Sequence, residues 1–197
     1  MKKNLDGRFV GRVFLPDEKR RIFSDSDPER ILWQLWAAKE TAYKIISKAH
    51  PAVHSGPLKY RVTLSGVCSI SSALLSCRVE TPVGGVSIVI QNEAEYVHAF
   101  GCSDGCTALE TMHSKVFRLD QDRFADRTES DAVREMLCLD LGCSWGVPAG
   151  EIDVRRCPGE RGAGPPVVYI SGKAASVDIS LSHHGRYGAF VWLGTQP

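Results

Sequence analysis

The stretch Asp27-Pro-Glu-Arg-Ile-Leu-Trp-Gln-Leu-Trp36 opens a long amphipathic pattern. Asp27 can accept the unpaired amide hydrogens at a helix start, and Pro28 suits the first helical position because the amide there needs no partner. We expect a helix from Pro28 to about Lys48, ended by His50-Pro51 and Ser55-Gly56-Pro57. Its apolar residues recur every three or four positions, as on one helical face: Ile31, Leu32, Leu35, Trp36, Tyr43 and Ile46.

Short segments rich in β-branched and aromatic residues follow this helix, separated by Gly, Ser and Asn. The strand candidates are Leu58 to Leu64, Val86 to Ile90 and Tyr96 to Phe100. The serine-rich stretch Ser65 to Ser76 fits a strand and a loop equally well. This half therefore predicts a helix that covers a small antiparallel sheet.

The second half of the sequence repeats this scheme. A charged stretch, Arg118 to Arg127, leads to a predicted helix from Glu129 to about Leu141, with Thr128 or Ser130 as its cap and Gly142 as its stop. Three further strand candidates follow: Glu151 to Arg155, Val167 to Ile170 and Val177 to Leu181. We expect an α+β fold, a pseudo-twofold pair of helix-on-antiparallel-sheet modules comprising residues 1–110 and 111–197 and forming one compact unit.

Composition narrows the classes of function. The 197 residues are 43% hydrophobic and 24% charged, with a formal net charge of +1, so no strong field favours a nucleic acid or an anionic membrane. No apolar run approaches the roughly 18 to 20 residues that a membrane helix requires, and the first residues lack the apolar core of a signal peptide. We expect a cytoplasmic protein without nucleic-acid or membrane partners.

Seven cysteines cannot all pair within one chain, and in a reducing compartment we expect most of them to be buried thiols. One cluster leaves a different interpretation open. Cys102 and Cys106, with His98 and His113 nearby, supply the ligand types of a zinc site, although no second closely spaced cysteine pair accompanies them. A thiol or zinc protein is therefore one alternative.

Glu40 and Lys44 are four residues apart on the first predicted helix and so share one face. One interpretation is a solvated ion pair worth about 0.3 to 0.5 kcal/mol. The other is a metal-binding carboxylate beside a phosphate-binding ammonium.

A second group of polar residues follows the strand candidate Val177 to Leu181. Alternation directs Val177, Ile179 and Leu181 inward, and the strand leads to His183, His184 and Arg186 at a glycine-containing turn. Such groups suit a polyanion. A surface hairpin without a function explains the same pattern.

Together these segments resemble one family. Trp36-Ala-Ala-Lys39-Glu40-Thr-Ala-Tyr-Lys44 resembles the W-x-x-K-E-A-x-x-K signature of 4'-phosphopantetheinyl transferases, and Ile179-Ser-Leu-Ser-His183 resembles that family's strand ending in Ser-His. Phe14-Leu-Pro-Asp-Glu18 looks like the Phe-x-x-x-Glu lead into the signature helix. Val133-Arg134-Glu-Met-Leu137 resembles a helix of the surfactin-type members.

The resemblance implies the transfer of 4'-phosphopantetheine from coenzyme A to a serine of an acyl or peptidyl carrier protein. Asp6 and Glu40 would hold Mg²⁺. Glu40 would also accept the serine proton, and Lys44 would meet the charge that develops on the leaving phosphate. The phosphates of coenzyme A would be bound by four side chains: Lys39, Arg134, His183 and Arg186.

Two departures from the family pattern affect these expectations. The surfactin-type members carry the Ser-His half first, whereas here the Lys-Glu half leads, which predicts a circular permutation and a complete site within a monomer. The Gly-Lys-Pro turn of the family is Gly164-Pro-Pro166 here and lacks its lysine. A weak or inactive relative that binds coenzyme A or a carrier domain is therefore a further alternative.

Overall fold

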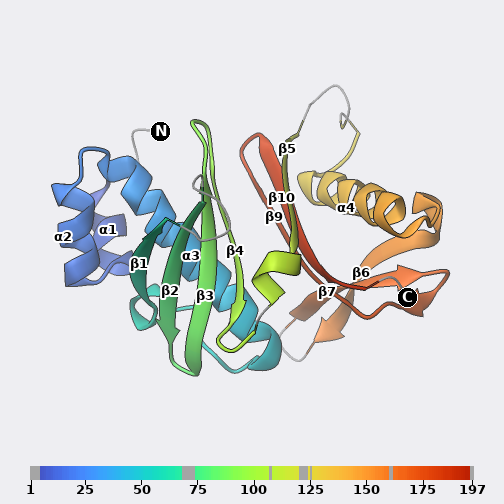
Figure 1. Cartoon of the computed structure of the whole chain (residues 1–197), viewed down its shortest axis with the longest axis horizontal. Helices are drawn as coiled ribbons and strands as arrows, with labels where there is room; N and C mark the ends of the chain where they lie inside the picture. Colours follow the sequence, from blue (N-terminus) through green and yellow to red (C-terminus); the bar gives the residue numbers. More distant parts are fainter. Residues whose placement is uncertain are drawn as a thin grey trace. The chain divides into compact units, whose positions relative to one another are not determined.

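A computed structural model describes residues 5–67, 74–106, 108–119, 124, 126–159 and 162–195. Contacts within the chain divide it into two compact units, Met1–Glu110 and Thr111–Pro197. The described residues form four α-helices and three antiparallel sheets, which confirms the predicted α+β class (Figure 1). None of the helices in this part of the chain is long and apolar enough to span a membrane.

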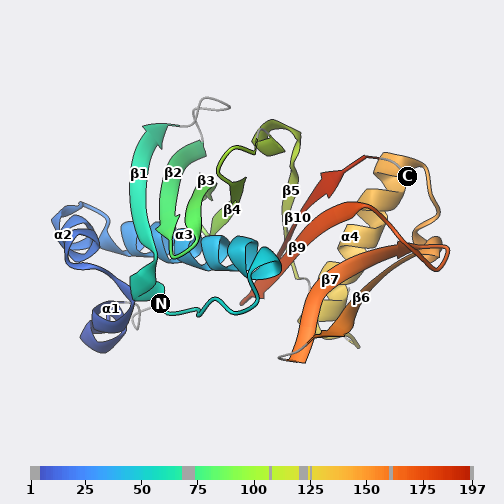
Figure 2. The same cartoon turned by 90° about the horizontal axis from the view of Figure 1, so that it is seen from below.

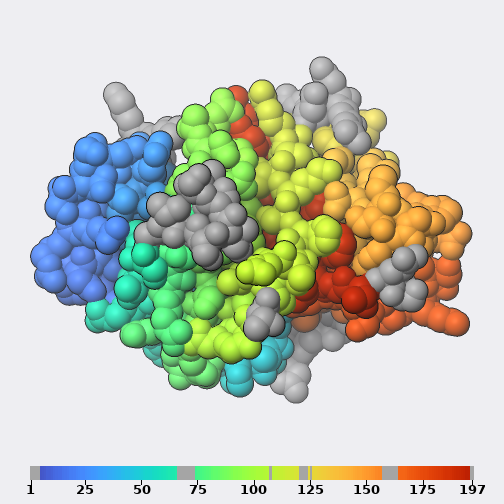
Figure 3. Space-filling view, viewed as in Figure 1, coloured from blue at the N-terminus to red at the C-terminus, as the bar shows by residue number. Residues whose placement is uncertain are grey.

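Three helices open the first unit: α1 (Gly7–Val13), α2 (Pro16–Ser24) and α3 (Pro28–Ala49). The predicted ends of α3 are confirmed to within a residue, and the Asp27 carboxylate accepts a hydrogen bond from the Arg30 amide at 3.1 Å. Neither α1 nor α2 was predicted from the sequence. Both are short, and α1 and α2 form part of the surface of this unit (Figure 3).

A four-stranded antiparallel sheet completes the first unit, with its strands in chain order. They are β1 (Arg61–Val67), β2 (Leu74–Thr81), β3 (Gly84–Asn92) and β4 (Val97–Ser103). The short helix η1 (Pro57–Lys59) precedes β1, so the expected strand start at Leu58 is wrong. The undecided stretch Ser65 to Ser76 contributes to β1 and β2 at its ends, and its residues 68–73 lie outside the described residues.

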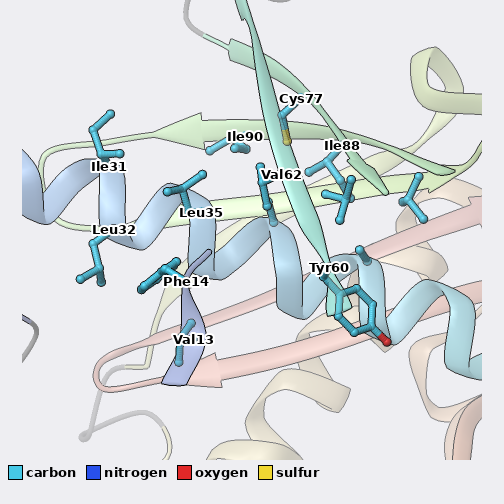
Figure 4. Packing of buried hydrophobic residues seen from close by; sticks show 14 of the residues in the cluster. Val13, Phe14, Ile31, Leu32, Leu35, Tyr60, Val62, Cys77, Ile88 and Ile90 are labelled. Carbon is cyan, nitrogen blue, oxygen red and sulfur yellow. The ribbon is translucent and has the colours of Figure 1, made fainter. Parts of the chain in front are cut away.

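The long helix α3 lies across one face of this sheet (Figures 1 and 2). Leu35 of α3 packs with Val62 and Ile90 of the sheet, and each is at most 7% exposed (Figure 4). Phe14, from the link between α1 and α2, extends the same cluster. Alternate strand residues therefore fix the face that α3 covers, and with it the direction of the polar residues of α3.

The second unit contains a single α-helix among its described residues, α4 (Glu129–Trp145), and two three-stranded sheets. The short helix η2 (Ala108–Thr111) spans the boundary between the two units, and η3 (Ala149–Glu151) follows α4. One sheet has the order β5-β10-β9 and the other β6-β7-β8. The strands are β5 (His113–Arg118), β6 (Ile152–Gly159), β7 (Gly162–Ile170), β8 (Lys173–Ala174), β9 (Val177–His184) and β10 (Tyr187–Gly194).

Two details of this unit differ from the predictions. The helix α4 continues past Gly142 to Trp145 and ends at Gly146, which has the left-handed φ of 67° that favours glycine. A strand, β5, precedes α4, so the unit does not simply follow the order helix then strands. The apolar face of α4, including Leu137 and Leu141, packs with Ile179 and Phe190 of the sheet.

Candidate active site

Lys39 lies at the centre of a buried group of polar atoms in the first unit. Its side chain is 1% exposed, and its Nζ forms an ion pair with Glu18 at 2.8 Å. The same ammonium donates hydrogen bonds to the carbonyls of Pro57 at 3.0 Å and Tyr60 at 2.6 Å. Three partners match the three hydrogens of an ammonium.

Both carboxylate oxygens of Glu18 also accept hydrogen bonds. Its Oε2 accepts a hydrogen bond from the Leu15 amide at 2.8 Å, and its Oε1 accepts one from the Val62 amide at 3.0 Å. Burial lowers the pKa of Lys39, and the hydrogen bond and charge of Glu18 oppose that change. The ion pair therefore joins α2, α3, η1 and β1, and we assign Lys39 this structural role in place of the phosphate contact expected from the sequence.

Glu40, the next residue along α3, has different surroundings. Its carboxylate is half-buried, and within the described part of the chain it makes no hydrogen bond and no ion pair. Burial raises the pKa of Glu40, while the charge of Lys44 acts in the opposite direction. A half-buried carboxylate with no hydrogen-bond donor of its own is suited to an external cation or proton.

The aromatic residues around Glu40 come from several elements. The Tyr60 ring meets Tyr43 edge to face, with centroids 6.4 Å apart, and the Tyr60 hydroxyl donates to the His54 carbonyl at 3.1 Å. Burial raises the pKa of Tyr60, and the charges of Tyr43 and Glu40 raise it further. Glu40 therefore faces the corner where η1 leads into β1.

Asp6 lies at the start of α1, where its Oδ1 accepts a hydrogen bond from the Arg8 amide at 3.0 Å. One turn further, Phe9 packs edge to face on Trp36, with ring centroids 5.6 Å apart. Because Trp36 is one turn before Glu40, this contact sets α1 against the neighbouring turn of α3. Asp6 is exposed.

The donor types on these elements fit Mg²⁺. The ion prefers oxygen ligands, and it commonly takes one or two carboxylates together with waters and substrate phosphates. Among the residues that the structure describes, no donor competes for the Glu40 carboxylate, and Asp6 has a second oxygen beyond the one that caps α1. Among the described residues no group of three or more His, Cys, Asp or Glu side chains forms an all-protein metal site.

Two of the predicted residues of the second unit, His183 and Arg134, lie at the first two turns of α4. His183, at the end of β9, places Nδ1 2.7 Å from Oε2 of Glu129, the first residue of α4. Arg134 donates to Asp131 at 2.9 Å. Asp131 also accepts from the Thr128 hydroxyl, and this hydrogen bond, together with the charge and hydrogen bond of Arg134, lowers the pKa of Asp131.

Arg186 lies in the turn between β9 and β10, and its guanidinium is 5.9 Å from the centre of the Tyr187 ring. His184 ends β9 and is exposed. The structure thus groups Lys39, Glu40 and Lys44 on α3. It brings Arg134 and His183 to one end of α4.

The cysteine cluster lacks the geometry of a zinc site. Cys102 is buried on β4, and its thiol donates to the Cys106 carbonyl at 3.5 Å. Burial raises the pKa of Cys102 to about 12, which opposes the thiolate that zinc requires. His98 stacks on Phe100, and His113 belongs to the second unit, where it stacks on Trp192.

The carboxylates that pair with Lys39 and His183 were not predicted from the sequence. Glu18 was noted only as part of a family pattern, and Glu129 only as a helix start. Glu18 follows Pro16 at the third position of α2, where a glutamate can accept from the amide before the helix, so capping was the available signal. The pairing of Glu129 with His183 joins residues 54 positions apart and has no local signal.

Comparison with known families gives a match over the first part of the chain. Residues 1–75 match the family model of the 4'-phosphopantetheinyl transferase superfamily, which confirms the predicted resemblance over this segment. The match includes Asp6, Glu18 and the signature helix with Lys39, Glu40 and Lys44. At the level of the superfamily it supports phosphopantetheinyl transfer. No curated protein and no solved structure matches the chain.

Proposed function

We propose that this protein transfers 4'-phosphopantetheine from coenzyme A to a serine of an acyl or peptidyl carrier protein. The observation that carries the proposal is Glu40, a half-buried carboxylate without a hydrogen bond or ion pair among the described residues, within a segment that matches the transferase superfamily. In the proposed reaction the serine oxygen attacks the phosphorus that bears pantetheine. The bond from that phosphorus to the nucleotide breaks, which releases 3',5'-ADP.

Glu40 and Asp6 are the proposed magnesium ligands. A bound Mg²⁺ would neutralise charge on the pyrophosphate. Glu40 would also accept the serine proton, directly or through a water.

Lys44 is the proposed partner of the leaving phosphate. It lies one turn beyond Glu40 on α3, and its charge acts on Glu40. An ammonium stabilises the negative charge that grows on the departing oxygen. Lys39 is not proposed for this role because its three hydrogens already bind Glu18 and two carbonyls.

Arg134, His183 and Arg186 are the proposed contacts for the nucleotide phosphates. Nδ1 of His183 faces Glu129, so its other ring nitrogen, Nε2, is the one that would meet a phosphate. Arg134 uses one of its five N–H groups on Asp131, and a guanidinium can bind a carboxylate and a phosphate together.

We propose a circularly permuted surfactin-like order of the two units, action as a monomer, and a cytoplasmic location. The match at residues 1–75 puts the Lys-Glu half first, which supports the permuted order. Five cysteines in the described part are free thiols, as a reducing compartment favours. The alternative is a protein of the same fold that binds coenzyme A or a carrier domain without transfer.

Mass spectrometry of a carrier protein tests the proposal against this alternative. The carrier is incubated with the protein, coenzyme A and Mg²⁺, with a second sample that lacks Mg²⁺. We expect the mass of phosphopantetheine to appear on the carrier serine only when Mg²⁺ is present. Binding of coenzyme A with no gain in carrier mass would contradict transfer and favour the binding protein.

A further inference from the structure

The buried ion pair of Lys39 and Glu18 joins the signature helix to three other segments. Lys39 reaches the carbonyls of Pro57 and Tyr60, and Glu18 reaches the amides of Leu15 and Val62. All four contacts are with the main chain, and three of them reach another segment, because Leu15 caps the helix that carries Glu18. The pair therefore fixes the path of the backbone and not only the packing of side chains.

The backbone that the pair holds forms the corner beside Glu40. The carbonyl of Tyr60 accepts from Lys39 at 2.6 Å, and the ring of Tyr60 packs on Tyr43, one turn beyond Lys39. Tyr43 follows Glu40 by three residues on α3, so the ring of Tyr60 packs on the stretch of helix that carries Glu40. Movement of this corner would change the burial of the Glu40 carboxylate.

The pair also sets the direction of Glu40 itself. Adjacent residues of an α-helix point about 100° apart because 3.6 residues make a turn. Lys39 is held by three atoms of two other segments, so α3 cannot rotate about its axis at this point. The direction in which Glu40 leaves the helix is fixed as a result.

We propose that Lys39 and Glu18 are positioning residues that hold Glu40 and the corner at Tyr60 in the geometry required for divalent-cation binding. This inference rests on the proposed function. Neither side chain touches the cation or the substrate. Their contribution is to keep the Glu40 carboxylate half-buried and directed toward its ligand.

The test uses Glu18→Asp, which keeps the buried charge but shortens the side chain by one methylene. It cannot reach Lys39, Leu15 and Val62 together without displacing the corner. The matched control is Asp17→Glu, which changes the same methylene at the next position, where Asp17 forms an exposed ion pair with Arg61. Both variants are titrated calorimetrically with Mn²⁺ alone, without coenzyme A, beside the unaltered protein and Glu40→Gln.

We expect Glu18→Asp to bind Mn²⁺ at least tenfold more weakly, with Asp17→Glu unchanged. Unaltered binding by folded Glu18→Asp would overturn the positioning role. If Glu18→Asp fails to fold, the double variant Lys39→Met with Glu18→Gln replaces it, since removing both charges avoids an unpaired buried ion. Failure of that variant to fold would also overturn the proposal, because the pair would then be needed for folding itself.

Glu40→Gln separates this inference from the proposed function. Loss of Mn²⁺ binding in Glu40→Gln, with full binding in Glu18→Asp, would overturn only the positioning role. Full binding in Glu40→Gln would overturn the proposed metal site, and the positioning role with it.

Discussion

Lys39 and Glu40 are adjacent on α3, yet their surroundings assign them different roles. Lys39 is buried with three partners, whereas the Glu40 carboxylate has no hydrogen bond among the described residues. The spacing of charges along the helix could predict that Glu40 and Lys44 share a face. It could not predict that the Pro57 and Tyr60 carbonyls would occupy Lys39, because those contacts depend on how the chain returns to α3.

Lys39→Met is expected to destabilise the protein by about 3 to 5 kcal/mol, because it leaves the buried Glu18 carboxylate without its counter-ion. Urea unfolding followed by circular dichroism measures the change in the free energy of unfolding. Lys59→Met is the control, since Lys59 is exposed on η1 and should change stability by less than about 0.5 kcal/mol. Equal effects of the two substitutions would contradict the structural role of Lys39.

The lowered pKa of His98 predicts how the free energy of unfolding depends on pH. Burial, with a smaller contribution from the charge of Lys44, lowers the pKa of His98 from 6.5 to about 4. The unfolded chain therefore binds a proton below pH 6.5 that the folded chain does not bind until about pH 4, so stability falls as the pH drops through this range. The full decrease in the free energy of unfolding across this range is about 3 kcal/mol.

Unfolding experiments between pH 4 and pH 7 measure this slope, and His98→Gln is the comparison because glutamine does not titrate. We expect a flatter dependence in the variant. Identical slopes for the two proteins would show that His98 is not buried in its neutral form.

At the scale of elements, pattern and capping predicted the long helices better than the short ones. The 22-residue helix α3 has a periodic apolar face and a clear cap, and it was predicted to within a residue at each end. The helices α1 and α2 have seven and nine residues, too few for a reliable period, and are held by packing on α3. Glycine often ends helices, which favours Gly142 as the end of α4, but the left-handed conformation occurs at Gly146.

Gly188 of β10 lies close against side chains of β5 and α4. A Cβ at this position would lie 2.7 Å from the Phe117 ring and 2.8 Å from Cγ2 of Val133 on α4. We expect Gly188→Ala to cost about 1 to 3 kcal/mol through overpacking, measured as a shift in urea midpoint. Gly150→Ala is the control, since a Cβ there would meet nothing within 4 Å. A Gly188→Ala protein as stable as this control would contradict the packing of α4 on β10.

At the scale of the whole molecule, the proposed residues are distributed over both units. Asp6, Glu40 and Lys44 belong to Met1–Glu110, and Arg134, His183 and Arg186 belong to Thr111–Pro197. The sequence alone could indicate these two groups through a family pattern. The pairings of Lys39 with Glu18, His183 with Glu129 and Arg134 with Asp131 required the folded chain, because the first two join distant segments.

Mixing two variants tests whether one chain supplies the complete set of residues. Glu40→Gln and His183→Ala are each expected to lose most of their transfer activity, and an equimolar mixture should remain as inactive as the separate proteins. Carrier modification followed by mass spectrometry is the measurement. Recovery of activity on mixing would show that two chains share the residues and would contradict the proposed monomer.

The role of Glu40 is tested most directly by the single-turnover rate of carrier modification in Glu40→Gln, with coenzyme A and Mg²⁺ in excess. The substitution keeps the size of the side chain but removes both the ligand charge and the base. We expect a folded protein whose rate falls by at least about 10². Lys44→Ala should also slow transfer while Mn²⁺ binding stays near that of the unaltered protein, because an ammonium repels a cation. A folded Glu40→Gln protein that modifies the carrier serine at nearly the unaltered rate would contradict the proposed mechanism.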